Sequence, residues 1–249
     1  MRLLILGGTS EATRLAARLV DLGDVEPVLS LAGRTRAPAV QPVPTRIGGF
    51  GGADGLARYL RDEEIGAVVD ATHPFAARIS ANAASACAAA GVPLVAYTRP
   101  PWRAVAGDRW IEVADFAAAA AALGEKPRNV LLTIGRLEAA TFARAPQHRY
   151  VLRSIDPPEP RPDLPHLTIV LERPPFDEVH ERALIAAHAI DVLVTKNSGG
   201  TATGSKLAAA RALGLPVVMI ARPARPAGVP VLTDLEEVLG FLARHGAAP

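Results

Sequence analysis

The stretch Arg2–Glu11 reads RLLILGGTSE and decides the fold of this chain. Its run of four apolar residues predicts a buried strand, and the two glycines at positions 7 and 8 predict a tight turn after that strand. Ser10 is a suitable helix cap, and an amphipathic pattern follows it. A strand, a glycine turn and a helix in this order predict the first unit of a parallel sheet. Because the apolar run ends after four residues, it does not predict a signal peptide.

The same alternation continues along the rest of the chain. Apolar runs bounded by glycines and by helical patterns predict parallel strands that are covered on both faces. We expect strands over residues 2–6, 26–31, 43–47, 67–70, 94–97, 110–113, 130–133, 150–153, 167–171, 192–195 and 217–220. We expect helices over residues 10–21, 54–62, 74–90, 114–123, 176–187, 203–213 and 234–244.

The stretch 98–108 interrupts this alternation with two prolines and a glycine, which predicts a connection between domains. We therefore expect an α/β protein with two Rossmann-like parallel-sheet domains, residues 1–98 and 109–249, joined by a linker over residues 99–108. Each half is long enough to bury a core of its own. We expect a cleft between the two domains.

Composition and charge narrow the classes of function. Of the 249 residues, 49% are hydrophobic but only 4% are aromatic, which suits buried parallel strands and disfavours stacking of single-stranded nucleic acid. The formal charge is +2, so we expect no nucleic-acid partner. No stretch approaches the ~18 apolar residues of a membrane span, so we expect a cytoplasmic protein without membrane contact. The single cysteine, Cys87, has no Cys or His neighbour, so we expect no metal site.

The turn after the first strand is the first candidate site. Glycines at this place let the backbone approach a pyrophosphate, and the N-terminus of the following helix favours its negative charge. The spacing departs from G-x-G-x-x-G, so a tight turn without a ligand is the alternative. The candidate cofactor contacts are Gly7, Gly8, Thr9 and Glu11.

The residues after the second strand predict which dinucleotide is bound. NAD-binding folds place Asp or Glu there, whereas NADP-binding folds use Arg for the 2′-phosphate. No carboxylate occurs in residues 27–53, and Gly33 turns the chain after the strand. We expect Arg34 to bind a phosphomonoester, together with Thr35, Ser30 and Arg36, which favours NADPH over NADH. A solvated surface arginine is the alternative.

A glycine-rich stretch, Gly48-Gly49-Phe50-Gly51-Gly52, follows the third expected strand. Four glycines in five residues cost conformational entropy on folding, so they indicate a sharp turn or a close approach to a ligand. We take Gly51 as a candidate cofactor contact. A mobile lid is the alternative.

The stretch Asp70-Ala71-Thr72-His73-Pro74 begins at the last residue of the fourth expected strand. The carboxyl end of this strand lies at the binding crevice of a doubly wound sheet, so Thr72 and His73 are candidate cofactor contacts. His73 is also a weak candidate for the catalytic acid, because an unperturbed imidazole titrates near neutral pH. The alternative is that both residues cap a helix that Pro74 starts.

A second loop, Lys196–Gly200, again follows an apolar strand and precedes a helix. Its residue order departs from a Walker phosphate loop because Ser205 precedes Lys206, which disfavours an ATPase. Its cations and hydroxyls favour binding of carboxylates. The candidate substrate contacts in and after this loop are Lys196, Ser198, Gly199, Gly200, Thr203 and Lys206. Further candidates are Tyr97 and Arg99 at the domain junction and Arg153 at a strand end.

Taken together, these motifs resemble the precorrin-6A reductase family, which includes the cobalt-precorrin-6A reductases. The resemblance rests on GGTSE at 7–11, AGRT at 32–35, GGFGG at 48–52, DATHPFA at 70–76, YTRP at 97–100 and TKNSGG at 195–200. It implies reduction of one double bond of the tetrapyrrole precorrin-6A by NADPH, giving precorrin-6B, in cobalamin biosynthesis. It also implies a cofactor site in the N-terminal half, a carboxylate-rich substrate on the second half, and transient contact with neighbouring pathway enzymes.

Two other functions remain open. A non-enzymatic NADP-binding redox sensor would explain the motifs of the first half but not the loop around Lys196. A two-domain nucleotide-sugar enzyme would share the architecture. The sequence leaves open the proton donor, the face that receives the hydride, the presence of cobalt in the substrate, and the oligomeric state.

Overall fold

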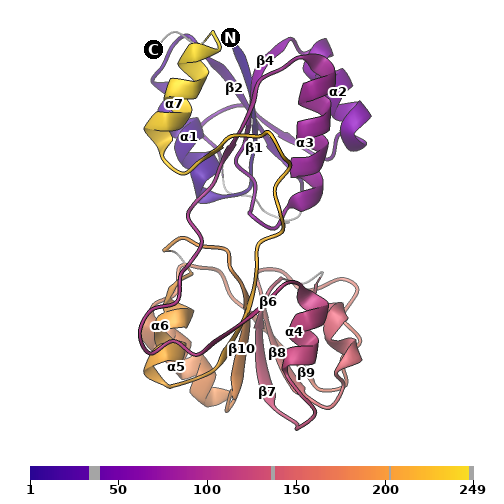
Figure 1. Ribbon diagram of the computed structural model, residues 1–249, viewed down its shortest axis with the longest axis vertical. Coiled ribbons are helices and arrows are strands. Elements are labelled where there is room, and N and C mark those ends of the chain that lie inside the picture. Colours follow the sequence, from indigo (N-terminus) through magenta and orange to yellow (C-terminus); the bar gives the residue numbers. More distant parts are fainter. Residues whose placement is uncertain (34–39, 136–137, 202, 247–249) are drawn as a thin grey trace. The chain divides into compact units, whose positions relative to one another are not determined.

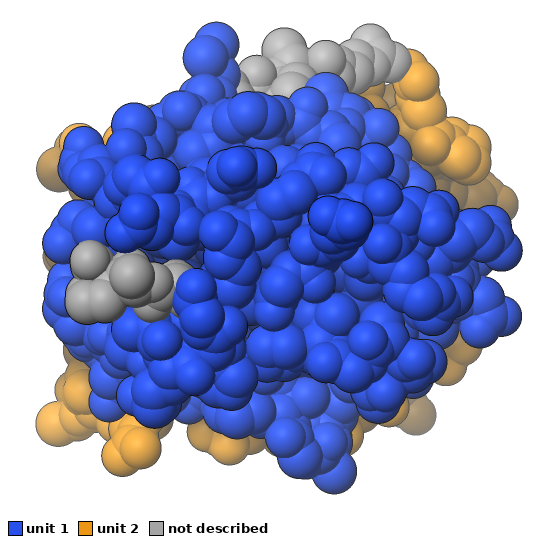
Figure 2. All heavy atoms as spheres, turned by 90° about the horizontal axis from the view of Figure 1, so that it is seen from above, with its two compact units in different colours: residues 1–100, 223–249 blue, residues 101–222 orange. Residues whose placement is uncertain are grey.

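The computed structural model describes residues 1–33, 40–135, 138–201 and 203–246, and the chain divides into two compact units (Figures 1 and 2). Unit 1 consists of Met1–Pro100 and Pro223–Pro249, and unit 2 consists of Pro101–Arg222. Figure 2 colours unit 1 blue and unit 2 orange. Each unit contains a six-stranded sheet in which every described pair of neighbours is parallel. The predicted α/β class with two parallel sheets is therefore confirmed.

The sheet of unit 1 has the strand order β12-β5-β4-β1-β2-β3. Counted along the chain within this unit, the order is 3-2-1-4-5-6, which is that of a dinucleotide-binding Rossmann sheet. The strands are β1 (Arg2–Leu6), β2 (Glu26–Leu31), β3 (Thr45–Ile47), β4 (Ile65–Asp70), β5 (Leu94–Tyr97) and β12 (Val231–Leu232). The helices are α1 (Ser10–Val20), α2 (Gly52–Asp62), α3 (Ala77–Ala90) and α7 (Leu235–Arg244).

Both faces of this sheet are covered, α1 and α7 lying on one side and α2 and α3 on the other (Figure 1). Alternate residues of β1 enter opposite cores, because successive side chains of a strand point to opposite faces. Leu3 and Ile5 pack with α1 and α7, whereas Leu4 and Leu6 pack with α2 and α3. This double burial explains the unbroken apolar run at the start of the chain.

The sheet of unit 2 has the order β6-β11-β10-β7-β8-β9. Strands β7 to β11 repeat the 3-2-1-4-5 arrangement, and β6, at the start of the unit, takes the sixth position. The strands are β6 (Trp110–Val113), β7 (Asn129–Thr133), β8 (Arg149–Ser154), β9 (Leu167–Leu171), β10 (Val192–Lys196) and β11 (Val217–Ile220). The helices are α4 (Phe116–Ala122), the 3-10 helix η1 (Ala139–Arg144), α5 (Glu178–Ala187) and α6 (Ser205–Ala212).

The predicted extent of the second domain, residues 109–249, was wrong at the C-terminal boundary. Residues 223–249 belong to unit 1, where β12 pairs with β5. Two backbone hydrogen bonds hold this pairing, from Ala96 N to Pro230 O and from Thr98 N to Leu232 O. The residues of the predicted linker, 99–108, are divided between the units: Arg99 and Pro100 belong to unit 1 and residues 101–108 to unit 2.

The predicted helices and strands otherwise lie within three residues of the observed ones. The largest difference is at α3, which begins at Ala77 and not at Pro74. Two short elements were not predicted, β12 and η1. None of the described helices is both long enough and apolar enough to cross a membrane.

Candidate functional site

The carboxyl ends of β1 and β4 form the centre of the candidate site in unit 1. These neighbouring strands lead to helices on opposite faces of the sheet, and such a switch point is where open α/β sheets bind ligands. The two strand ends are joined by hydrogen bonds. Ala71 N donates to Leu6 O at 2.9 Å, and the Thr9 hydroxyl donates to Ala71 O at 2.7 Å.

The glycine turn after β1 has two distinct requirements. A Cβ on Gly7 would lie 2.6 Å from a methyl carbon of Leu29, so this position needs glycine for close packing. Gly8 has φ +109 and no described atom within 4 Å of a Cβ built on it, so the backbone there is open to a ligand. The helix that follows is capped by Thr9, which accepts from Ala12 N, and not by Ser10 as predicted. The turn therefore aims a helix N-terminus at the switch point.

Glu11 and Arg99, predicted to bind cofactor and substrate respectively, form an ion pair with each other. The Arg99 guanidinium donates to Glu11 Oε2 at 2.8 Å, and both side chains are largely buried. Burial alone would raise the pKa of Glu11. Its own backbone N–H and the Arg99 charge together outweigh burial, so the pKa lies below its usual value. The pair neutralises a carboxylate that would otherwise repel an anion at the N-terminus of α1.

The turn after β4 is organised around the buried carboxylate of Asp70. One oxygen accepts from Thr72 N at 3.1 Å and from the Thr72 hydroxyl at 2.6 Å, and the other accepts from the Ser80 hydroxyl at 2.6 Å. Arg225, from the C-terminal segment, lies 3.5 Å from the second oxygen. These contacts fix the turn that begins at Asp70, the last residue of β4, and leads to His73.

His73 does not cap α3. That helix is preceded by Ala76, which makes no side-chain cap, so the alternative that Thr72 and His73 cap it is wrong. His73 Nδ1 accepts from Phe75 N at 3.2 Å. A neutral imidazole whose Nδ1 accepts a hydrogen bond carries its proton on Nε2.

Beside β2, an arginine that the sequence interpretation missed lies at the strand ends. Arg46 of β3 donates to the Ser30 hydroxyl at 2.8 Å and to the carbonyl oxygens of Gly48 and Gly49 at 3.1 Å each. Its guanidinium carbon lies 3.9 Å from the centre of the Phe50 ring. A signal for it was present, because Arg46 is the penultimate residue of a strand in a sheet whose strand ends carry the other candidates.

The structure describes only some of the other candidate cofactor contacts near the ends of β2 and β3. The described residues do not include Arg34, Thr35 and Arg36. Gly33 has φ +69, and a Cβ on it would lie 3.1 Å from Ile47. Gly51, with φ +81, directly precedes α2. Both positions favour glycine for backbone reasons.

These features of unit 1 fit a phosphorylated dinucleotide. A glycine turn open to a ligand and a helix N-terminus suit a pyrophosphate. Arg46 adds a cation beside the end of β2, where a 2′-phosphate is recognised in such folds. The Thr98 hydroxyl, directly after β5, is buried and has no hydrogen-bond partner among the described residues. Tyr97, predicted to contact substrate, is 2% exposed and belongs to the core of unit 1.

In unit 2, the loop after β10 is fixed by side chains from within the unit. The side-chain amide of Asn197 accepts from Trp102 N at 2.8 Å and donates to Trp102 O at 3.0 Å. Arg222 donates to the carbonyl oxygens of Asn197 and Ser198 at 2.9 and 3.0 Å. Trp102 Nε1 donates to Gly200 O at 2.9 Å. These carbonyl oxygens are therefore engaged inside the unit, which reduces their repulsion of an anion at the loop.

The two lysines of this region differ in their surroundings. Lys206 is buried, donates to Thr203 O at 2.6 Å and lies 4.7 Å from the Trp102 ring centre. Lys196 lies at the switch point between β10 and β7. A Cβ built on Gly135, after β7, would be 3.7 Å from Lys196 Nζ and 3.1 Å from a carboxylate oxygen of Glu138. Lys196 is thus close to the turn after β7 as well as to its own loop.

Arg153, a predicted substrate contact, has a partner within unit 2. Its guanidinium donates to both carboxylate oxygens of Glu181 at 2.9 and 3.0 Å, and both side chains are buried. The same guanidinium stacks on the Phe176 ring at 4.1 Å. These contacts account for Arg153 without a ligand, and its role in substrate binding stays a prediction.

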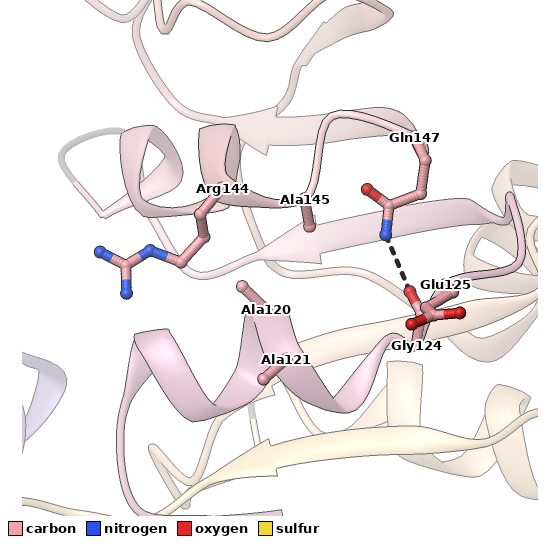
Figure 3. A pocket seen from close by; sticks show the side chains of 7 residues that line it. All are labelled: Ala120, Ala121, Gly124, Glu125, Arg144, Ala145 and Gln147. Atoms are coloured by element: carbon pink, nitrogen blue, oxygen red, sulfur yellow. Dashed lines mark hydrogen bonds between the residues drawn. The ribbon is translucent and has the colours of Figure 1, made fainter.

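A pocket of about 250 Å³ lies elsewhere in unit 2 (Figure 3). It is lined by the end of α4 and by residues that precede β8, among them Arg144 and Gln147. It therefore borders the amino ends of the strands, away from the loop at Lys196. Within the described ranges, no group of three or more His, Cys, Asp or Glu side chains is placed to hold a metal ion.

Sequence reasoning missed Asn197, Arg222 and Asp70 as well as Arg46. The first two support the loop after β10, and Asp70 supports the turn after β4. Asp70 and Asn197 stand inside motifs that had been recognised, but the pattern does not reveal which side chain turns inward. Arg222 is the second residue after β11, and this position near a strand end is the only sequence feature that pointed to it.

Comparison with known proteins shows the family to which this chain belongs. The family model described as Precorrin-6x reductase CbiJ/CobK matches residues 2–243. A protein from Rhodobacter capsulatus named precorrin-6A reductase is 54% identical over 248 residues, which cover 100% of this chain and 98% of the relative. A protein from Priestia megaterium named cobalt-precorrin-6A reductase is 30% identical over 254 residues and 98% of each chain. The solved structure of a CobK precorrin-6A reductase has 53% identity and a TM-score of 0.94, covering 100% of this chain and 98% of that chain. This chain belongs to the precorrin-6x reductase CbiJ/CobK family.

Proposed function

We propose that this protein reduces precorrin-6A to precorrin-6B with NADPH, in cobalamin biosynthesis. The observation that carries the proposal is the similarity along the whole chain to a protein named precorrin-6A reductase, at 54% identity. Identity to the relative named for the cobalt-containing substrate is lower, at 30%, which favours the metal-free substrate.

In this proposal NADPH binds to unit 1 and supplies the hydride. The turn at Gly7 and Gly8 and the N-terminus of α1 would hold the pyrophosphate. Thr9 positions that turn, because its hydroxyl joins it to Ala71 at 2.7 Å. Thr72 and His73 follow β4, where the nicotinamide half of a dinucleotide lies in folds of this type. The protein contributes placement and electrostatics.

The substrate carries many carboxylates, and unit 2 would bind them at the loop after β10. Lys196 provides a cation at a switch point, and Ser198, Gly199 and Gly200 provide a turn whose carbonyl oxygens are partly engaged by Arg222 and Trp102. Lys206 supports this loop through Thr203 O. Binding of the tetrapyrrole by Tyr97, Arg99 and Arg153 remains a prediction, and so do a cytoplasmic location and contact with neighbouring pathway enzymes.

Reduction of a carbon–carbon double bond also needs a proton. His73 is a candidate donor, because its Nδ1 accepts a bond from Phe75 N and the ring proton is then on Nε2. Water and a substrate carboxyl are equal candidates. The proton donor is therefore left open within the proposal.

The proposal is tested by following oxidation of NADPH by the purified protein, with and without precorrin-6A. We expect oxidation only when the tetrapyrrole is present, and formation of precorrin-6B. Tight binding of NADPH without oxidation by any tetrapyrrole would instead support a redox sensor. Preference for a uridine nucleotide over NADPH would support a nucleotide-sugar enzyme.

A further inference from the structure

Arg46 is placed where a phosphorylated ribose is distinguished from an unphosphorylated one. It stands on β3 next to β2, and the pairing aligns it with Ser30, the penultimate residue of β2. Its Nη1 atom donates to the Ser30 hydroxyl at 2.8 Å. In Rossmann sheets the end of this second strand is where the ribose 2′ position is recognised.

In the part of the chain that the structure describes, Arg46 forms no ion pair with a carboxylate. The guanidinium is half-buried, and within the described residues it forms hydrogen bonds only with neutral oxygens, those of Ser30, Gly48 and Gly49. These three bonds leave two of the five N–H groups of an arginine for another acceptor. A half-buried cation of this kind gains most from an anionic ligand.

Two aromatic rings fix the plane of the guanidinium. The Phe50 ring centre lies 3.9 Å from its central carbon, and the Tyr59 ring centre lies 5.2 Å away. The two rings meet edge to face, with 5.2 Å between their centres. An arginine whose planar guanidinium is held in this way loses little conformational entropy when it binds two oxygens of a phosphate.

We propose that Arg46 is a specificity-determining residue, whose guanidinium, presented beside the Ser30 hydroxyl, binds the 2′-phosphate of NADPH. This rests on the proposed function, and it adds a second cation from β3 to the arginine predicted at position 34. Arg46 would also link cofactor binding to the glycine-rich turn, because the same side chain donates to Gly48 O and Gly49 O.

The test compares two small ligands that differ only in the 2′-phosphate, adenosine 2′,5′-bisphosphate and adenosine 5′-monophosphate. Isothermal titration would measure both affinities for the full-length wild type, Arg46→Gln and Arg46→Lys. We expect Arg46→Gln to weaken the bisphosphate by about 10-fold to 100-fold, the range for a charge-assisted hydrogen bond, and the monophosphate by less than about threefold. Arg46→Lys should lie between, because it keeps the charge and loses the planar fork.

The matched control is Arg2→Gln, the same substitution at the amino end of the unit 1 sheet, where Arg2 pairs with Glu63. It should leave both affinities unchanged, and thermal unfolding should show that each variant is folded. If Arg46→Gln weakens both ligands equally, Arg46 only supports the glycine-rich turn and the proposal is overturned. If Arg46→Gln does not fold, an unchanged affinity ratio in Arg46→Lys overturns it as well.

The role of Arg46 and the proposed reductase function can be supported or contradicted independently of each other. A loss of selectivity for the bisphosphate supports the role of Arg46 whether or not precorrin-6A is turned over. Turnover of precorrin-6A with NADPH and with NADH at equal efficiency in the wild type would leave the reductase function intact and would contradict the specificity role.

Discussion

At the scale of single residues, the ion pair between Glu11 and Arg99 makes the stability of unit 1 depend on pH. The pKa of Glu11 in the folded protein is below the usual 4.5, so the folded state favours the carboxylate more than the unfolded state does. Its contribution is therefore present above pH 4.5 and is lost as the pH falls through the folded-state pKa. We expect Glu11→Gln to cost about 1–3 kcal/mol of unfolding free energy at neutral pH.

Urea unfolding at a series of pH values measures this effect. The difference between wild type and Glu11→Gln should shrink as the solution is acidified below pH 4.5. Glu63→Gln is the matched control, because Glu63 also pairs with an arginine, Arg2, but both side chains are more than one-third exposed. Such exposed pairs contribute about 0–1 kcal/mol. A pH-independent difference for Glu11→Gln would contradict the assigned ion pair.

Residue patterns predicted where the candidate residues stand but not which of them pair with each other. Glu11 and Arg99 are 88 positions apart, and Arg153 and Glu181 are 28 positions apart. Glu11, Arg99 and Arg153 each had a plausible role as a ligand contact when considered alone. A buried charge needs a partner, and that partner is set by the packing of helices on the sheet, which the local pattern does not contain. The glycine turns were easier to predict, because their requirement is local to the backbone.

At the scale of elements, α7 is the helix whose contribution to unit 1 was not expected. Its buried side chains Val238 and Leu242 pack into the same core as Leu15 and Leu19 of α1. We expect Leu242→Ala to destabilise unit 1 by about 2–5 kcal/mol, because Leu242 is 1% exposed and its removal leaves a cavity. Thermal unfolding should show a lower midpoint for this variant, and its affinity for NADPH should be weaker than that of the wild type.

The matched control for this helix is Leu213→Ala, the same change at a residue that is 49% exposed, in unit 2. It should change the free energy of unfolding by less than about 0.5 kcal/mol. Equal effects of the two substitutions would contradict the docking of α7 on the sheet of unit 1.

Helices and strands were predicted poorly where the element is very short, or where a residue typical of a helix start does not begin the helix. The strand β12 has two residues, too few for any alternating or continuous pattern to be recognised. Pro74 indicated a helix start, but the chain first makes a turn in which Ala76 N bonds His73 O at 2.7 Å, and α3 begins afterwards. Longer apolar strands such as β1 and β10 were predicted because burial on both faces gives them unbroken apolar sequences.

At the scale of the whole molecule, the two units differ in which segments of the chain supply their strands. All six strands of unit 2 come from the continuous segment between Trp110 and Ile220. Unit 1 instead includes β12 and α7, which follow unit 2 in the sequence. The sequence shows two similar α/β halves, and nothing in its periodicity indicates that the last strand and helix return to the first.

This topology predicts how fragments of the chain behave. Residues 101–222 should fold cooperatively alone, whereas residues 1–100 should not, because they lack α7 and the edge strand that covers β5. Loss of the buried Val238, Phe241 and Leu242 removes about 1.5–3 kcal/mol each. That sum is comparable with the total stability of a small domain, about 5–15 kcal/mol.

Joining residues 1–100 to residues 223–249 through a flexible Gly/Ser linker of about ten residues should restore a folded unit. Urea unfolding of each fragment, followed by circular dichroism, measures cooperativity, and titration with NADPH measures the site. We expect the joined fragment alone to bind NADPH, because the turn at Gly8, the α1 N-terminus and Arg46 all belong to unit 1. If residues 1–100 by themselves unfold cooperatively and bind NADPH as tightly, then β12 and α7 are not needed for the fold of unit 1. If instead only residues 101–222 bind it, the cofactor site has been assigned to the wrong sheet.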